Sequence, residues 1–422
     1  MNTHTLTTLS NWGSKGLTIF INLYSIRILS QKLSEQDYAL FILLMGLQSW
    51  LVLIDLGVGS SIQNYVVEQR ANKKNYDIYL YNGYILSWGL FIIFSVIFSI
   101  LRVPLASSYL SEISISISEK ISYVTLVFLL LSITFLNETI YKVKYGEEEG
   151  YKGIIIYSVG RILGFIGIVL LSLSSQQHSV ITYILISLSP SAMISFLYYG
   201  YRFFHIASLS LFSKSVTRQI LSRGFLFWLY SIALYLPFFT EYWVLGKFLS
   251  SKDIVFYNLL KRLYEIPSFM YNAILLSSWV VFTQLYIQKD YRKIIEKIRK
   301  NILIGMTLLI LATALLSVLA AFILKILAPE FIFLSDTIWI AFFGVYFILR
   351  VWVDTFSTFL QSVSKLHYLI IFYTFVGVIS ILLEFYLTTY FKLYGIVAAL
   401  VIPLFILSII LPLYVKKVLK YK

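Results

Sequence analysis

Residues 28–47 read ILSQKLSEQDYALFILLMGL, and residues 244–263 read VLGKFLSSKDIVFYNLLKRL. At an offset of 216 positions the two stretches agree at seven of twenty residues. The offset is close to half of the chain, which indicates a parallel internal repeat. Leucine matches are common in lipid, so chance convergence is the alternative. The shared Ser-x-x-Asp favours a true repeat, because it suits a helix start, where serine caps free N–H groups and the carboxylate opposes the helix dipole.

The composition places the chain in a lipid bilayer. Hydrophobic residues make up 59% of it, the mean hydropathy is +0.83 and only 13% of residues are charged. That leaves too little polar surface to coat a water-soluble protein. The chain has no cysteine, so disulfides, iron–sulfur clusters and thiol nucleophiles are excluded. Its four histidines lie in the predicted tail and loops, which argues against a buried imidazole metal site.

Runs of about 20 mainly apolar residues are long enough to cross the hydrocarbon core of a bilayer. We therefore expect an all-α polytopic membrane protein with twelve transmembrane helices, in two six-helix bundles around a central cavity. The expected spans are 9–30, 38–61, 79–101, 121–141, 153–173, 180–201, 224–246, 254–287, 301–325, 336–360, 368–390 and 395–415. The parts are an N-terminal bundle (1–203), a cytoplasmic amphipathic linker (204–223) and a C-terminal bundle (224–422).

The basic residues of the connecting segments predict the orientation. Segments after even-numbered spans carry 21 Lys and Arg residues, and those after odd-numbered spans carry 7. Because cytoplasmic loops hold the excess of positive charge, both termini are predicted to be cytoplasmic. The formal charge of +14 mostly reflects this bias, so it gives little support for binding nucleic acid.

Leaving out the terminal residues of the spans, twelve charged side chains lie inside them, six of each sign. The cations are Lys15, Arg27, Arg161, Lys261, Arg262 and Arg350, and the acids are Asp55, Glu138, Glu241, Glu265, Asp354 and Glu384. A charge at the centre of a membrane helix costs at least about 2.5–3.5 kcal/mol, so such residues normally face a bundle interior or a watery cavity. We therefore predict a charged, hydrated pathway through the protein.

About the first 75 residues carry a family resemblance. Residues 29–71 read LSQKLSEQDYALFILLMGLQSWLVLIDLGVGSSIQNYVVEQRA, and the most specific part is DLGVGSS at 55–61, before a basic turn. This pattern resembles the start of Wzx-type O-antigen and polysaccharide flippases in the multidrug/oligosaccharidyl-lipid/polysaccharide exporter superfamily. The resemblance implies a carrier in the bacterial inner membrane. Its cargo would be oligosaccharide linked to undecaprenyl pyrophosphate, turned from the cytoplasmic to the periplasmic leaflet by alternating access; the sugar is not specified.

Such a cargo suits the cations in the spans. A cavity lined by Arg and Lys can replace the hydration of a pyrophosphate with charge-assisted hydrogen bonds. We predict substrate binding by Arg161, Arg350, Arg262, Lys261, Arg27 and Lys15. Arg161 is the strongest candidate, because it lies near mid-depth with no acid of its span nearby in sequence. The structural alternative is local neutralisation, since Arg350–Asp354 and Lys261–Glu265 are both spaced i,i+4.

The carboxylates are candidates for ion coupling. The sequence has no nucleotide-binding P-loop, so an ion gradient, the membrane potential or consumption of the product must supply the energy. Glu241, Asp55, Glu265 and Asp354 are the predicted sites for a coupling proton or sodium ion, and no other cofactor or metal is expected. Asp55 could instead hold its turn, and Glu138 and Glu384 are predicted to lie at the membrane interface.

Two other functions remain open. A multidrug or cation antiporter of the same superfamily would have a cavity dominated by acids, unlike the even balance here. A membrane enzyme of the same polysaccharide pathway would place a large hydrophilic loop in the periplasm, whereas the longest such loop here is 102–120. We predict a transporter and not an enzyme. Its expected partners are the lipid-linked glycan, the bilayer, and the polymerase and other proteins of the pathway, with no nucleic acid.

Overall fold

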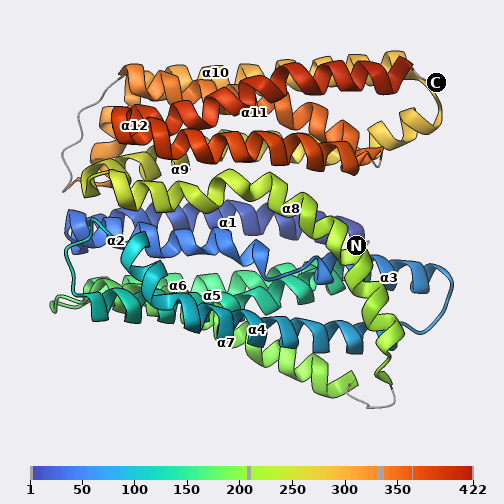
Figure 1. Ribbon diagram of the computed structural model, residues 1–422, viewed down its shortest axis with the longest axis horizontal. Coiled ribbons are helices and arrows are strands. Elements are labelled where there is room, and N and C mark those ends of the chain that lie inside the picture. Colours follow the sequence, from blue (N-terminus) through green and yellow to red (C-terminus); the bar gives the residue numbers. More distant parts are fainter. Residues whose placement is uncertain (1–2, 207–210, 330–336, 364, 421–422) are drawn as a thin grey trace. The chain divides into compact units, whose positions relative to one another are not determined.

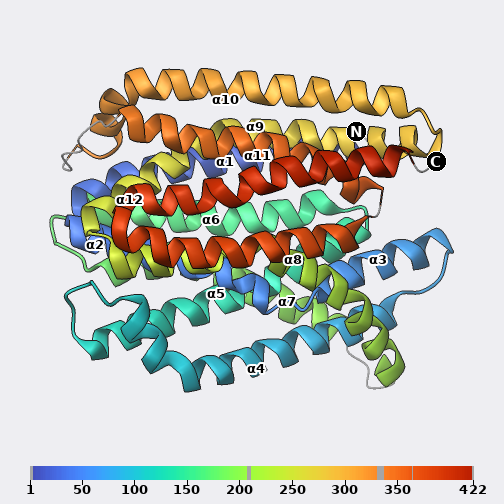
Figure 2. The same ribbon diagram turned by 45° about the horizontal axis from the view of Figure 1, so that its top comes forward.

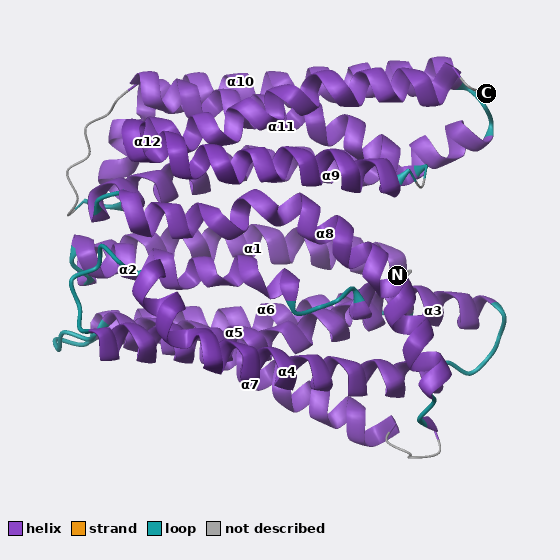
Figure 3. Ribbon diagram, viewed as in Figure 1, coloured by secondary structure: helices purple, strands orange, loops and turns teal. Residues whose placement is uncertain are grey.

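The computed structural model describes residues 3–206, 211–329, 337–363 and 365–420, which are almost entirely helical and include no strand (Figures 1 and 3). Packing divides the chain into two compact units, residues 1–232 and 233–422. Nine helices within the described ranges are long and apolar enough to cross a membrane. The prediction of an all-α, multi-pass membrane protein in two bundles is confirmed.

The first unit contains α1 to α7 and the beginning of α8. Its elements are α1 (Thr3–Lys32), α2 (Glu35–Gly46), the 3-10 helix η1 (Leu47–Leu53), α3 (Val58–Ala71), α4 (Asp77–Tyr109), α5 (Ile117–Gly146), α6 (Gly150–Leu173), α7 (Val180–Ile206) and the start of α8 (Lys214–Phe248). Helix α1 packs along α6, and α5 packs against α3, α4 and α7. The strip between α1 and α6 holds the site residues of this unit.

The second unit contains the rest of α8 and four more helices. These are α9 (Ser251–Ile287), α10 (Tyr291–Leu327), α11 (Thr337–Ser362) and α12 (Leu366–Lys420). Helix α10 packs against α9 and α11, and Figure 2 shows the three helices together. Helix α12 covers both of the last two predicted spans. Its backbone leaves helical geometry between them, at Lys392 (φ 48°, ψ −125°), so α12 consists of two helical parts. Its two parts lie together, with the Ser380 hydroxyl donating to the Ala399 carbonyl at 3.0 Å.

The second predicted span, 38–61, is not one helix. Helix α2 ends at Gly46, η1 follows, and α3 begins at Val58 after a turn. Leu56 and Gly57 have positive φ values of 44° and 69°, a region that favours glycine. The Asp55 carboxylate accepts a hydrogen bond from the Gly59 N–H at 3.2 Å and so caps the first turn of α3. The predicted span therefore contains a turn, which the local Asp-Leu-Gly sequence stabilises.

The beginning of α8 packs on this turn. A Cβ atom on Gly57 would lie 2.0 Å from the Gly224 carbonyl oxygen, so the two backbones touch. The Trp228 indole N–H donates to the Leu53 carbonyl at 3.2 Å, and Arg223 forms an ion pair with Glu68 at 2.7 Å. These contacts place the start of α8 in the first unit. The boundary by packing therefore lies at 232/233, inside a helix, whereas the sequence suggested 223/224.

The predicted linker, 204–223, lies partly outside the described residues. Its C-terminal half, from Lys214, forms the first turns of α8 and is not a separate surface helix. Its expected position against the cytoplasmic face of the membrane stays a prediction. The central cavity expected between the two bundles also stays a prediction.

Candidate functional site

Arg161 of α6 lies against α1 in the first unit. Its guanidinium donates to the Thr18 hydroxyl at 3.1 Å, to the Asn22 side-chain oxygen at 3.0 Å and to the Tyr157 hydroxyl at 3.4 Å. Thr18 and Asn22 are one turn apart on α1, so they present two acceptors to the same fork. All three acceptors are neutral, and within the described part of the chain no carboxylate forms an ion pair with Arg161. The positive charge is therefore oriented but not neutralised.

A row of polar side chains on α1 and α6 continues from Arg161. The Ser158 hydroxyl donates to Ser14 at 2.8 Å, and the Asn11 amide donates to the Tyr145 hydroxyl of α5 at 2.6 Å. We call Asn11, Ser14, Thr18, Asn22, Tyr157, Ser158 and Arg161 the polar strip; its members are half-buried. Polar groups inside predicted spans normally face a protein interior or water and not lipid. The strip thus presents hydrogen-bonding groups away from lipid.

Lys261 of α9 pairs with Glu241 of α8 in the second unit. Its ammonium lies 2.5 Å from the carboxylate, and the Glu241 side chain is fully buried. The ammonium also lies within 6 Å of the ring centres of Phe238 and Tyr242, at distances that allow cation–π attraction. Pairing between Lys261 and Glu265, the local alternative considered from sequence, does not occur among the described side chains.

Glu384 of α12 is a buried acid that the sequence placed near the membrane interface. Its side chain is fully buried, accepts a hydrogen bond from the Thr240 hydroxyl at 2.6 Å and accepts another from Ser380 at 3.3 Å. Thr240 directly precedes Glu241, which brings the two carboxylates into one group with Lys261. The second oxygen of Glu241 is buried and finds no hydrogen-bond partner in the described ranges. Within the described ranges Lys261 forms an ion pair with Glu241 only, and Glu384 is held by hydroxyl groups.

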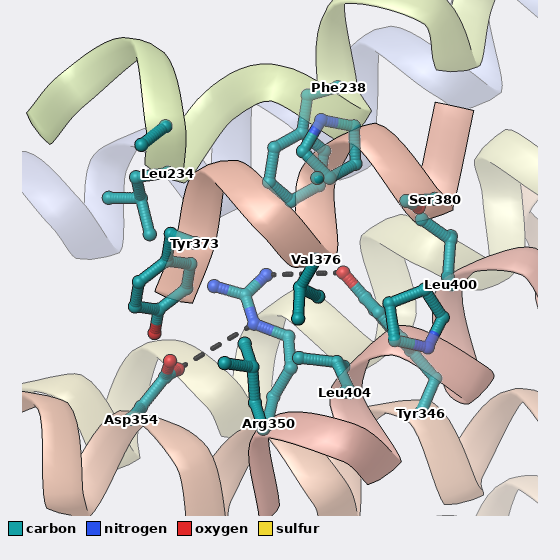
Figure 4. Close-up of a pocket in the computed structure, with 15 residues that line it drawn as sticks. Leu234, Phe238, Tyr346, Arg350, Asp354, Tyr373, Val376, Ser380, Leu400 and Leu404 are labelled. Atoms are coloured by element: carbon teal, nitrogen blue, oxygen red, sulfur yellow. Dashed lines mark hydrogen bonds and ion pairs between the residues drawn. The ribbon is translucent and has the colours of Figure 1, made fainter. Parts of the chain in front are cut away.

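Arg350 and Asp354 stand one turn apart on α11, with 3.6 Å between guanidinium nitrogen and carboxylate oxygen. The guanidinium also reaches the Tyr346 hydroxyl at 3.5 Å, and Figure 4 shows Arg350 between these two partners. Both distances are long for charge-assisted hydrogen bonds, which are usually about 2.7–2.9 Å. The guanidinium is thus held loosely, beside a small cavity of about 60 Å³ lined also by Phe238 and Tyr373.

A larger cavity of about 250 Å³, lined by residues of α9 and α11, also includes the same ion pair in its wall. Glu265, Ser268 and Asn272 line it from α9, and Arg350 and Asp354 line it from α11. We call it the α9–α11 cavity. Arg350 and Asp354 both line the two cavities, so a ligand in either one would lie beside this ion pair.

The remaining predicted residues lie apart from these groups. Arg262 donates to the Asn258 side-chain oxygen at 2.9 Å and forms no ion pair within the described ranges. Asp55 is occupied in capping α3. Lys15 is half-buried one residue after Ser14 of the polar strip, and Arg27 is exposed farther along α1. The twelve charges therefore do not form one cluster in either unit. Six of them fall into three groups, which are Arg161 in the polar strip, Glu241 with Lys261 and Glu384 (the Glu241 group), and the Arg350–Asp354 pair of α11.

Glu384 and the polar strip are features that sequence reasoning missed. Ser380 stands four residues before Glu384, and Ser14, Thr18 and Asn22 recur at helical spacing within one apolar span. Such polar residues at i,i+4 steps inside a membrane helix were the available signal.

Comparison with known proteins finds relatives that are named O-antigen transporters or export proteins. The chain is 29% identical over 401 residues to a Salmonella typhi protein named "Putative O-antigen transporter", covering 94% of this chain and 92% of that protein. It is 28% identical over 410 residues to a "Putative O-antigen export protein" of Yersinia pseudotuberculosis, with coverage of 94% and 92%. No family model matches the chain. The resemblance found in the sequence is thus confirmed over nearly the whole length, and the relatives are named transporters, not enzymes.

Solved structures show the same fold. An inward-facing multidrug resistance MATE family transporter of the MOP superfamily matches with a TM-score of 0.80 at 15% identity, covering 96% of this chain and 95% of the other. An outward-facing structure of such a transporter matches with a TM-score of 0.69 at 13% identity, with coverage of 99% and 96%. The chain is therefore a multi-pass membrane protein with the fold of these transporters.

Proposed function

We propose that this protein is a flippase for oligosaccharide linked to undecaprenyl pyrophosphate, such as an O-antigen repeat unit. It carries the unit from the cytoplasmic to the periplasmic leaflet of the bacterial inner membrane, with both termini in the cytoplasm. The names of the curated relatives support the cargo. The observation that carries the proposal is Arg161, whose guanidinium is held only by neutral oxygens. Such a charge is costly in a membrane protein unless an anion recurrently pairs with it.

The pyrophosphate binds to Arg161 through two parallel N–H···O hydrogen bonds from one edge of the planar guanidinium, which are charge-assisted and bidentate. Thr18 and Asn22 hold the fork in position while the cargo is absent. Arg350 gives a second cationic contact, since its long bonds to Asp354 and Tyr346 are easily exchanged for phosphate oxygens. Lys261, Arg262, Arg27 and Lys15 remain proposed contacts at other depths. The cargo passes by alternating access, and the polymerase of the same pathway is the proposed consumer.

Replacing Arg161 tests this function. In a strain that depends on this gene for surface polysaccharide, Arg161→Ala should abolish the polysaccharide at normal protein abundance, and Arg161→Lys should restore only part. A lysine keeps the charge but loses the planar fork. Arg292→Ala is the control, because Arg292 is 90% exposed at the start of α10. Normal polysaccharide in Arg161→Ala would contradict the contact, and acquired sensitivity to cationic drugs in a gene deletion would favour the antiporter instead.

We further propose that the Glu241 group binds the coupling proton or sodium ion. Glu241 and Glu384 are both fully buried, and one oxygen of Glu241 has no hydrogen-bond partner among the described residues although Lys261 pairs with the other. The group therefore offers a carboxylate oxygen to a cation. Asp55 and Asp354 are weaker candidates, since one caps a helix and the other pairs with Arg350. Glu241→Gln and Glu384→Gln should leave the protein inserted but remove the dependence of transport on the ion gradient. Unchanged gradient dependence in both variants would exclude the group.

A further inference from the structure

The α9–α11 cavity has a chemistry that phosphate binding does not explain. Glu265 and Asn272 lie two turns apart on one face of α9, and both side chains are exposed toward the cavity that they line. Neither has a hydrogen-bond or ion-pair partner in the part of the chain that the structure describes. A free carboxylate repels a pyrophosphate, so this wall of the cavity is built for another part of the cargo.

The free groups match the hydroxyls of a sugar. A carboxylate accepts hydrogen bonds, an amide both donates and accepts, and the Arg350 guanidinium donates; each sugar hydroxyl can serve either role. The half-buried ring of Phe269 gives the same cavity an apolar wall. A few convergent polar groups on an apolar lining are typical of small-molecule sites.

The size of the cavity limits the ligand. Sites for drug-sized ligands hold about 300–1,000 Å³, whereas the α9–α11 cavity holds about 250 Å³. It therefore fits one sugar ring and not a whole repeat unit. Because Arg350 forms one of its walls, a sugar bound here would lie beside a cation that the proposed function assigns to phosphate.

We propose that the α9–α11 cavity binds one sugar ring of the cargo glycan through Glu265, Asn272 and Arg350. The inference rests on the proposed function and adds a contact that distinguishes glycan-bearing lipid from bare lipid. It assigns Glu265, a coupling candidate from sequence alone, to cargo recognition. An unoccupied carboxylate and amide would also reject a cargo that cannot complete their hydrogen bonds, which makes the site a source of selectivity.

Binding measurements on the full-length protein in nanodiscs test the assignment. The probes are undecaprenyl pyrophosphate bearing the oligosaccharide, extracted from the producing strain, and bare undecaprenyl pyrophosphate. Asn272→Ala and Glu265→Gln should each lower the preference for the glycan-bearing lipid about five- to tenfold, the effect of one lost hydrogen bond. Ser277→Ala on α9 and Glu296→Gln on α10 are matched exposed controls outside the cavity. Arg161→Ala should weaken binding of both lipids by a similar factor.

Each other outcome overturns the assignment. Equal losses for both lipids in Asn272→Ala and Glu265→Gln would mean that the cavity acts on the lipid or on the fold. An unchanged preference, with gradient dependence lost in Glu265→Gln, would return Glu265 to ion coupling. An unchanged preference, with ethidium binding lost, would make the cavity a site for organic cations. If the wild-type protein bound neither lipid, the proposed function itself would fall, and the sugar site with it.

Discussion

The two copies of the internal repeat begin alike and then differ. Ser34 caps α2 by accepting from the Asp37 N–H at 3.1 Å, and Ser250 caps α9 by accepting from the Asp253 N–H at 3.3 Å. Helix α2 then ends after 12 residues and gives way to η1 and a turn, whereas α9 continues for 37 residues. The start of the helix is shared, but its course is not.

The difference follows from a few residues. Extending the repeat by the same offset of 216 places Asp55 and Gly57 opposite Tyr271 and Ala273 of α9. A glycine can take positive φ at little cost, whereas alanine favours the helix. The turn in the first unit also receives α8, whose Gly224 touches Gly57. In the second unit the corresponding stretch of α9, with Asn272, lines the α9–α11 cavity. The same stretch of the repeat thus forms a turn packed on α8 in the first unit, which we call the joint. In the second unit it forms a wall of the α9–α11 cavity.

The largest effect is expected at the joint itself. Gly57→Ala would force alanine into positive φ and would drive its Cβ against the Gly224 carbonyl. The combined cost should be about 2–4 kcal/mol of folding free energy. We expect little protein in the membrane and a clearly lowered melting temperature for what remains. Gly89→Ala, a helical glycine with open space around it, is the control and should be neutral or slightly stabilising. Normal stability of Gly57→Ala would show that the joint can re-form as helix.

Sequence patterns predicted the helices and the repeated helix starts but not the contact that forms this joint. Apolar runs of membrane length and the repeated Ser-x-x-Asp were local signals, and both appear in the structure as caps and long helices. The break in 38–61 depends on Gly57 meeting Gly224, a contact between residues far apart in sequence. Hydropathy averages over such a turn and cannot detect it.

The charged residues show the same limit. Arg350–Asp354 pairs at the i,i+4 spacing visible in sequence, whereas Lys261 takes Glu241, 20 residues away, and not Glu265. Arg161 was named from its depth and its lack of a local acid, and its neutral partners on α1 could be identified only from the packing. Local spacing gives candidates, and helix packing decides among them.

The shared caps should respond equally. Ser34→Ala and Ser250→Ala each remove the acceptor of one N–H at a helix start, which typically costs about 1 kcal/mol. We expect similar falls in melting temperature for the two variants, measured in the same detergent. Ser277→Ala, whose hydroxyl returns to a carbonyl of its own helix, is the control. A much larger loss for Ser34→Ala would show that the cap of α2 also supports the joint. The two caps would then not contribute equally to stability.

A glycine placed in α9 sharpens the comparison. Ala273→Gly reproduces the residue of the joint without the partner glycine of α8. We expect a loss of about 1 kcal/mol, the ordinary helical cost of glycine, with the helix unbroken. Spin labels on either side of residue 273 would report the helix geometry. A bend in this variant would mean that glycine alone creates the joint and that packing by α8 is secondary.

The smallest effect concerns the ion pair that clamps the joint from outside. The hydrogen bond from Arg223 holds the pKa of Glu68 below its ordinary value of 4.5. A carboxyl with a depressed pKa contributes stability that is full above its unfolded pKa and is lost as the pH falls through its folded pKa. Since Glu68 is 48% exposed, the contribution should be below about 1 kcal/mol. The melting temperature of wild type should therefore fall slightly more than that of Glu68→Gln between pH 6 and pH 3. Equal falls would mean that the joint is held by Gly57, Gly224 and Trp228 without help from the clamp.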